Sequence, residues 1–241
     1  IVPVEKSNTI CLERLWMLDL ENKIVVVTGA AGDLGKAVVG KFLENKAIVC
    51  GIDHKVGRLQ GFASQSQGDQ HFYAFEDVDV TDRSAMLKLA ESIEDQVGQV
   101  DVIVNTVGGF TYGEMVHEHS YKTWQKMMDL NVQSFLNTTA AFVPGMIAKG
   151  SGKVVAIGSR ASLGGSPKSG AYSAAKGALL RLTESMAAEL KPNNIQVNCV
   201  LPGTIDTPEN RQDMPNSDFS KWVKPEQVAE VILFLSSARS N

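Results

Sequence analysis

Near its start the chain reads Ile24-Val25-Val26-Val27-Thr28-Gly29-Ala30-Ala31-Gly32-Asp33-Leu34-Gly35, and this stretch decides the fold. Its first residues are a β-branched run without alternation, which is typical of a strand buried on both faces of a parallel sheet. Three evenly spaced glycines follow, and a helix is predicted after them at Lys36–Glu44. Glycines between a strand and a helix let the backbone turn tightly and approach a pyrophosphate at the positive end of the helix. The stretch therefore predicts a phosphate-binding turn, and a purely structural glycine-rich turn is the alternative.

Strand and helix patterns alternate through the rest of the chain. Short apolar runs predict further strands at Ala47–Ile52, His71–Phe75, Val100–Val104, Lys153–Ile157 and Ile195–Val200. Longer apolar patterns predict helices at Arg83–Val97, Tyr121–Lys149, Tyr172–Leu190 and Pro225–Ser237. Such alternation implies a doubly wound parallel sheet with right-handed crossovers, which is a Rossmann-like α/β fold in one domain. We assign residues 23–241 to this domain and residues 1–22 to an N-terminal leader of unknown role.

Composition restricts the kind of protein and its partners. The net charge of −4 and the pI of about 5.6 predict no general attraction to nucleic acid or to an anionic membrane. No apolar run approaches the roughly 18 residues of a membrane span. The three cysteines lack metal or redox spacing, which favours a reduced, cytoplasmic protein. His117 and His119 have no further ligand-like residues beside them, so we expect no metal.

Tyr172 and Lys176 form the candidate catalytic pair. They lie four residues apart in an Ala/Leu-rich helical pattern, so they share one helix face. A phenol with a pKa of about 10 is a poor proton shuttle at neutral pH, and a neighbouring ammonium would lower that pKa. The alternative is a tyrosine and a lysine on an ordinary amphipathic helix.

Three further polar residues lie where a nucleotide or substrate would bind. Asp53 closes the second strand, where a carboxylate accepts both ribose hydroxyls of an adenosine and repels a 2′-phosphate; this favours NAD over NADP. Asn131 interrupts the apolar face of the predicted helix 121–149, and a buried amide usually has a partner. Ser159 follows the fifth strand, at the sheet edge where α/β proteins bind ligands. Taken singly, each is also explained as a structural residue.

In combination these residues resemble the short-chain dehydrogenase/reductase family, over about residues 23–237. The resemblance implies a catalytic tetrad of Asn131, Ser159, Tyr172 and Lys176. It also implies a set of residues that contact the cofactor: Gly29, Gly32, Asp33, Leu34, Gly35, Asp53, Asp79, Val80, Asn105, Gly108, Tyr172, Lys176, Pro202, Gly203 and Thr204. The implied activity is hydride transfer between NAD and a small carbonyl or alcohol substrate, with Tyr172 as general acid or base.

Two features depart from the usual family pattern. The motif after the fourth strand reads Asn105-Thr106-Val107-Gly108-Gly109 instead of Asn-Asn-Ala-Gly, and the chain stops where the family usually has a final strand. The segment Val107–Phe110 and the loop 206–222 are similar to the dihydropteridine reductase branch, so an NADH-dependent reductase of that kind is the second hypothesis. A cofactor-binding regulator without turnover is the third.

Assembly is predicted from the apolar content of two helices. They carry more apolar residues than one stripe needs: Trp124, Met127, Met128, Phe135, Leu136, Phe142, Met146, Leu179, Leu180, Leu182 and Met186. Related enzymes commonly pair these helices across a two-fold axis. We therefore expect a homodimer or a homotetramer.

Overall fold

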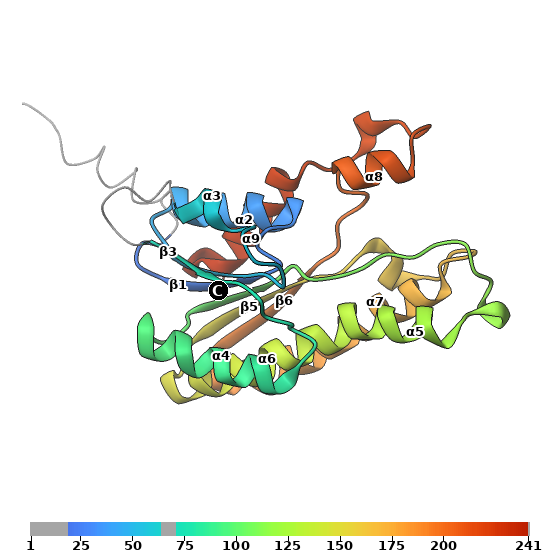
Figure 1. Cartoon of the computed structure of the whole chain (residues 1–241). Coiled ribbons are helices and arrows are strands. Elements are labelled where there is room, and N and C mark those ends of the chain that lie inside the picture. The colour runs from blue at the N-terminus through green and yellow to red at the C-terminus, as the bar shows by residue number, and fades with distance from the viewer. Residues whose placement is uncertain (1–18, 64–70, 241) are drawn as a thin grey trace, which may run out of the picture.

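Six parallel strands form one sheet in the computed structural model, which describes residues 19–63 and 71–240 (Figure 1). Across the sheet they are β3 (Phe72–Phe75), β2 (Ile48–Ile52), β1 (Ile24–Thr28), β4 (Val102–Asn105), β5 (Gly152–Ile157) and β6 (Ile195–Val200). The order reverses between β1 and β4, and ligands bind at the carboxyl ends of strands beside such a switch point. The predicted doubly wound, Rossmann-like sheet is confirmed.

Helices cover both faces of the sheet (Figure 1). One face carries α2 (Asp33–Glu44) and α9 (Pro225–Ser236), which pack on each other. The other face carries α4 (Arg83–Gln96), α6 (Ser134–Lys149) and α7 (Gly170–Leu190). The short helices α3 (Gln60–Ala63), α5 (Tyr121–Met128) and α8 (Pro208–Asp213) lie in or beside connections.

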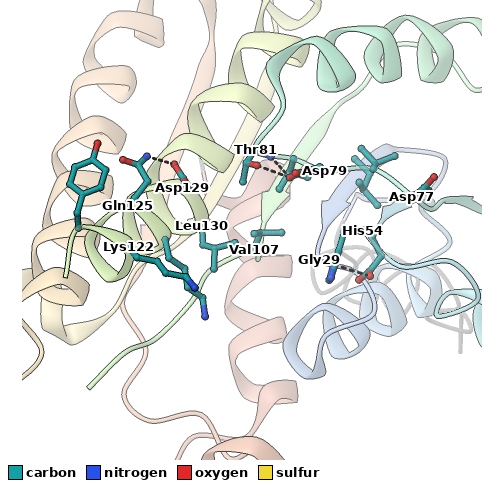
Figure 2. A pocket seen from close by; sticks show the side chains of 16 residues that line it. Gly29, His54, Asp77, Asp79, Thr81, Val107, Lys122, Gln125, Asp129 and Leu130 are labelled. Atoms are coloured by element: carbon teal, nitrogen blue, oxygen red, sulfur yellow. Dashed lines mark hydrogen bonds and ion pairs between the residues drawn. The ribbon is translucent and has the colours of Figure 1, made fainter. Parts of the chain in front are cut away.

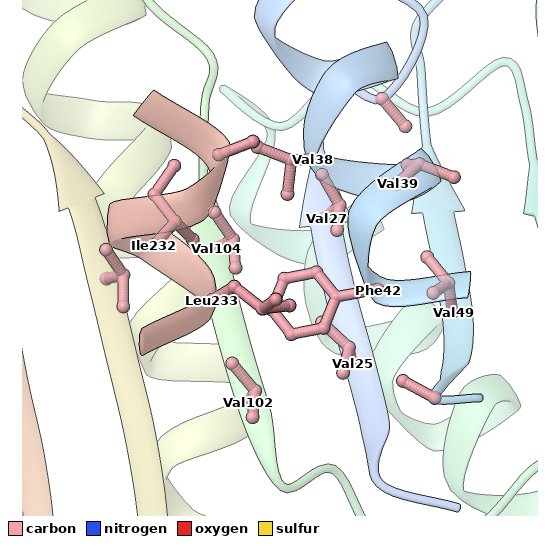
Figure 3. Packing of buried hydrophobic residues seen from close by; sticks show 14 of the residues in the cluster. Val25, Val27, Val38, Val39, Phe42, Val49, Val102, Val104, Ile232 and Leu233 are labelled. Atoms are coloured by element: carbon pink, nitrogen blue, oxygen red, sulfur yellow. The ribbon is translucent and has the colours of Figure 1, made fainter. Parts of the chain in front are cut away.

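The β-branched run of β1 explains the two-sided core. Successive strand residues point to opposite faces, so Val25 and Val27 pack with Phe42 of α2 and Leu233 of α9 (Figure 3). Val26 points the other way, into a second cluster under α4, α6 and α7. Apolar side chains cover both faces of β1, which explains why no polar residue interrupts the run Ile24–Val27.

Several boundaries of helices and of the N-terminal leader differ from those predicted from the sequence. The helix predicted at Tyr121–Lys149 is divided into α5 and α6 by a π-helical turn, Asp129–Gln133. Helix α2 begins at Asp33, inside the glycine stretch, and α7 begins at Gly170. Leu20, which the sequence assigned to the leader, is buried in the core beside α9; residues 1–18 of that leader lie outside the described residues.

The sheet of the described residues ends at β6, and the last helix, α9, is followed by a short 3-10 turn, Ala238–Ser240. Within residues 19–63 and 71–240, no helix is both long and apolar enough to cross a bilayer.

Candidate active site

The glycine turn after β1 has the geometry that the sequence predicted. Gly29 has a φ of +66°, and a Cβ there would lie 3.1 Å from side-chain atoms of both Thr106 and Val107. A Cβ on Gly35 would lie 2.1 Å from the carbonyl oxygen of Gly29, so α2 packs directly on the turn. Gly32 is the N-cap of α2 and makes no side-chain cap. The amino end of α2, which favours anions, therefore begins immediately beyond β1.

Two cavities contain most of the predicted site residues. The first, of about 810 Å³, is lined by predicted cofactor contacts at Gly29, Asp53, Asp79 and Val80 (Figure 2). The second, of about 920 Å³, is lined by the predicted residues Leu34, Gly108, Ser159, Tyr172, Lys176, Pro202, Gly203 and Thr204. Gly32, Asp33, Gly35, Asn105 and Asn131 line neither cavity.

Asp53 is held rigidly at the end of β2. Its side chain is buried, with the residue 4% exposed, and one carboxylate oxygen accepts a hydrogen bond from the Ala31 backbone N–H at 3.2 Å. The other oxygen accepts from the Lys55 backbone N–H at 3.2 Å and from Nη1 of Arg58 at 3.4 Å. Arg58 also donates through Nη2 to the Ala31 carbonyl at 3.0 Å. The sequence analysis missed Arg58, although an arginine five residues beyond a strand-end aspartate suggests an ion pair with that aspartate.

Asp79 and Val80 are positioned by local turns and by α6. An oxygen of Asp79 accepts from the backbone N–H and the hydroxyl of Thr81, at 2.8 and 2.7 Å (Figure 2). The carbonyl of Val80 accepts from Nδ2 of Asn137 at 3.1 Å. The two residues thus form a fixed wall of the first cavity, opposite the residues of α5.

Lys176 is a buried lysine at the base of the second cavity. It is 5% exposed, and its Nζ donates to the carbonyl of Ile157 at 2.8 Å. Burial lowers the pKa of Lys176 to about 8. A buried ammonium with one carbonyl partner keeps two N–H donors for other acceptors.

Tyr172 corrects one sequence expectation. Burial raises the pKa of Tyr172, and a side-chain hydrogen bond with Ser159 acts in the opposite direction. Lys176, which was expected to lower this pKa, does not offset the effect of burial. The physical reason is that desolvation of the phenolate outweighs the neighbouring groups in the protein alone.

Asn131 joins the π-helical turn to the loop after β4. Its Oδ1 accepts from the Gly109 N–H at 3.2 Å, and its Nδ2 donates to the carbonyls of Gly109 and Met127, each at 3.0 Å. A Cβ on Gly108 would lie 2.9 Å from Oδ1 of Asn131 and 3.2 Å from Nζ of Lys176. The amide and the ammonium therefore both lie close to the side of Gly108 where a Cβ would stand. Single π-helical turns often mark functional sites.

Asn105 provides a test of fit for a cofactor. Its Oδ1 accepts from the hydroxyls of Thr28 at 3.1 Å and Thr138 at 3.4 Å. Its buried Nδ2 has no partner among the described residues, and such a group normally has an acceptor. Together with the close backbone at Gly29 and Gly35, this matches a site built to hold a dinucleotide.

Other residues of the second cavity were not predicted as site residues. The ring of Phe110 lies edge-on to the ring of Tyr172, with centroids 5.0 Å apart at 83°. Glu209, Asp213 and Met214 line the opposite wall from α8 and its end. In the described part of the chain, no group of three or more His, Cys, Asp or Glu side chains is placed to hold a metal ion.

Comparison with known proteins decides the family. A family model described as short chain dehydrogenase matches residues 23–218. The chain belongs to the short-chain dehydrogenase family. It is therefore an oxidoreductase that uses a nicotinamide cofactor and acts on a carbonyl or alcohol group.

Individual relatives in the family are distant. The chain is 30% identical over 230 residues to the 3-oxoacyl-acyl-carrier-protein reductase FabG of Thermotoga maritima, covering 92% of this chain and 93% of the relative. It is 31% identical over 233 residues to 2-(S)-hydroxypropyl-CoM dehydrogenase 3 of Xanthobacter autotrophicus, covering 90% and 91%. The solved structure titled ElxO with NADP Bound superposes with a TM-score of 0.84 at 24% identity, covering 91% and 93%, and this likeness shows the fold alone.

Proposed function

We propose that Tyr172 exchanges a proton with the substrate oxygen in a carbonyl–alcohol interconversion. The observation that carries the proposal is that Ser159, Tyr172 and Lys176 line one cavity. The bound cofactor supplies or accepts the hydride. Ser159 holds the substrate oxygen against the phenol, and Lys176 uses its remaining N–H donors for the nicotinamide ribose. Asn131 keeps the loop at Gly109 in place beside Lys176.

The pH dependence of the rate in each direction follows from the pKa of Tyr172. Burial raises that pKa, so the residue is a protonated phenol at neutral pH and is ready to donate to a carbonyl oxygen. Reduction needs the phenol and oxidation needs the phenolate. The rate of reduction is therefore expected to be high near neutrality and to fall as the pH rises through the Tyr172 pKa, whereas the rate of oxidation rises.

The test is turnover of NADH against a panel of small ketones, aldehydes, 3-oxoacyl thioesters and a quinonoid dihydropteridine. Oxidation of NADH that depends on one of these carbonyl compounds supports the proposal. NADH binding without turnover of any of them would favour the regulator hypothesis instead.

A preference for NAD over NADP is the second part of the proposal. Asp53 is buried and fixed by three donors, so a 2′-phosphate would meet a desolvated like charge, whereas ribose hydroxyls would meet an acceptor. Arg58 is the opposing influence, because its guanidinium lies within 3.4 Å of the same carboxylate.

We expect the wild-type protein to show a higher kcat/KM with NADH than with NADPH. Asp53→Ala should lower the ratio of the two kcat/KM values by about tenfold or more, because the substitution leaves Arg58 free to pair with the 2′-phosphate. Steady-state rates with both cofactors measure this. Asp95→Ala, which removes an exposed aspartate of α4, is the matched control and should leave the ratio unchanged. A wild-type preference for NADPH would refute the assignment.

We also propose that the chain self-associates, although fewer apolar residues are available for an interface than the sequence suggested. Of the apolar residues that predicted an interface, Met127, Phe135, Phe142, Met146, Leu179 and Leu180 are buried within one chain. The others are Trp124, which is exposed, and Met128, Leu136, Leu182 and Met186, which are partly buried on α5, α6 and α7.

We expect light scattering at micromolar concentration to give at least twice the chain mass of 26.0 kDa. The reason is that an apolar surface spread over α5, α6 and α7 is most simply covered by its own two-fold copy. Trp124→Glu should shift the mass toward the monomer. A wild-type mass near that of one chain would show that the surface is not an interface.

A further inference from the structure

A carboxylate–histidine pair lies in the loop between β4 and α5. Nδ1 of His119 and Oε2 of Glu114 are 2.7 Å apart, and the side chain of His119 is only 11% exposed. Glu114 is itself held in place, because it accepts from the Thr123 hydroxyl at 2.9 Å and from the Ser120 N–H at 3.2 Å. The pair is therefore an ordered structure at the start of α5.

The other ring nitrogen of His119 contacts the helix that carries Tyr172. Nε2 accepts from the backbone N–H of Ala171 at 3.2 Å. That N–H belongs to the first turn of α7, where backbone donors have no partner within the helix, and the N-cap, Ser169, makes no side-chain cap. Because Ala171 can only donate, Nε2 must accept, and the ring hydrogen lies on Nδ1 and is donated to Glu114. Glu114 thus fixes the tautomer that lets His119 cap α7.

The same loop contacts the start of α7 and the residues just before it at three more places. The Gly113 N–H donates to the carbonyl of Lys168 at 2.9 Å, and Phe110 lies edge-on to Tyr172. At Gly170 the approach is so close that a Cβ would lie 2.7 Å from Cγ2 of Val116 and 3.3 Å from Nε2 of His119. The loop that forms one wall of the second cavity is therefore docked on the residues immediately before the phenol.

We propose that Glu114 and His119 are positioning residues that dock the β4–α5 loop on the first turn of α7 and so set the place of Tyr172. The proposal rests on the proposed role of Tyr172. His119 does not touch the reacting atoms; it acts through Ala171, the residue that precedes Tyr172. Misplacement of a catalytic group by about 1 Å costs about 10²-fold in rate, so a cap at this position has a large effect on catalysis.

The experiment compares three variants in the full-length protein. His119→Ala removes the acceptor, and His119→Gln keeps an amide oxygen near the position of Nε2. His117→Ala is the matched control, because that imidazole lies two residues earlier and is 76% exposed. The readouts are kcat with the best carbonyl of the panel, the Kd for NADH by fluorescence, and amide hydrogen exchange at the start of α7.

We expect His119→Ala to lower kcat by about tenfold or more, to leave the Kd for NADH within about twofold, and to speed exchange of the Ala171 amide. His119→Gln should recover most of kcat, and His117→Ala should match the wild type. If His119→Ala does not fold, Glu114→Gln replaces it. That variant keeps an acceptor for Nδ1–H but weakens the bond, so a loss of a few-fold in kcat is expected.

Two results would overturn the inference: kcat of His119→Ala within about twofold of wild type, or an equal loss in His119→Ala and His119→Gln. Amide exchange does not depend on turnover, so it reports the docking even if Tyr172 proves not to be the proton donor. Failure of the positioning role is thereby separated from failure of the proposed chemistry.

Discussion

Tyr172→Phe is expected to lower kcat by about 10²- to 10⁴-fold, which is the usual contribution of a positioned general acid or base. The substitution removes only the hydroxyl that the proposal makes the proton donor. The ring stays in its edge-on contact with Phe110, so the cavity keeps its shape. The affinity for NADH should change by less than about threefold, because the phenol is only one of the many cofactor contacts that we propose.

The control for this variant is Tyr112→Phe, the same chemical change at a tyrosine of the β4–α5 loop that is 65% exposed. It should have wild-type kcat. Turnover by Tyr172→Phe within about tenfold of wild type would remove Tyr172 from the mechanism and leave Ser159 as the hydroxyl nearest the substrate.

The fold was predictable because its signals are local and repeated. The run Ile24–Val27 could not be a half-exposed strand, since every residue is apolar, and the structure places Val25 and Val26 in different cores. The glycine turn was equally readable. A Cβ on Gly35 has no room, so the spacing in the sequence reflects a steric requirement.

The site was less predictable where its geometry depends on long-range contacts. Asn131 was identified as an unusual residue on a helix, but the π-helical turn that aims its amide at Gly109 has no clear sequence signal. His119 was missed for the same reason, because its partner Ala171 lies 52 residues away in the chain. Arg58 was missed although its partner Asp53 lies only five residues before it.

The protonation of the site also differs from the sequence expectation. Proximity of Lys176 to Tyr172 suggested that the lysine lowers the pKa of the phenol. Instead, burial dominates for both residues: it lowers the pKa of Lys176 and raises the pKa of Tyr172. Spacing along a helix predicts that two side chains lie close together, but it does not predict how far they are buried from water.

The burial of Lys176 implies that keeping this lysine in the site lowers the free energy of unfolding of the protein. The pKa of Lys176 falls from 10.5 to about 8 in the folded protein. Below pH 8 the lysine is charged in both the folded and the unfolded state, and the folded state carries the full cost of burying that charge. Between pH 8 and 10.5 the unfolded state binds more protons, so the stability of the wild type rises with pH in that window.

Lys176→Met is therefore expected to abolish turnover and weaken NADH binding, yet to raise the free energy of unfolding of the cofactor-free protein at pH 7. The relief of desolvation is about 3 kcal/mol at about 1.4 kcal/mol per pKa unit. Loss of the hydrogen bond to the Ile157 carbonyl offsets about 1 kcal/mol of it. Urea unfolding should show the variant about 2 kcal/mol more stable at pH 7, with the difference shrinking steadily toward pH 10. Lys191→Met, at an exposed lysine just beyond the end of α7, should show neither effect. A Lys176→Met variant less stable than wild type at pH 7 would mean that the ammonium is better solvated by its neighbours than its burial implies.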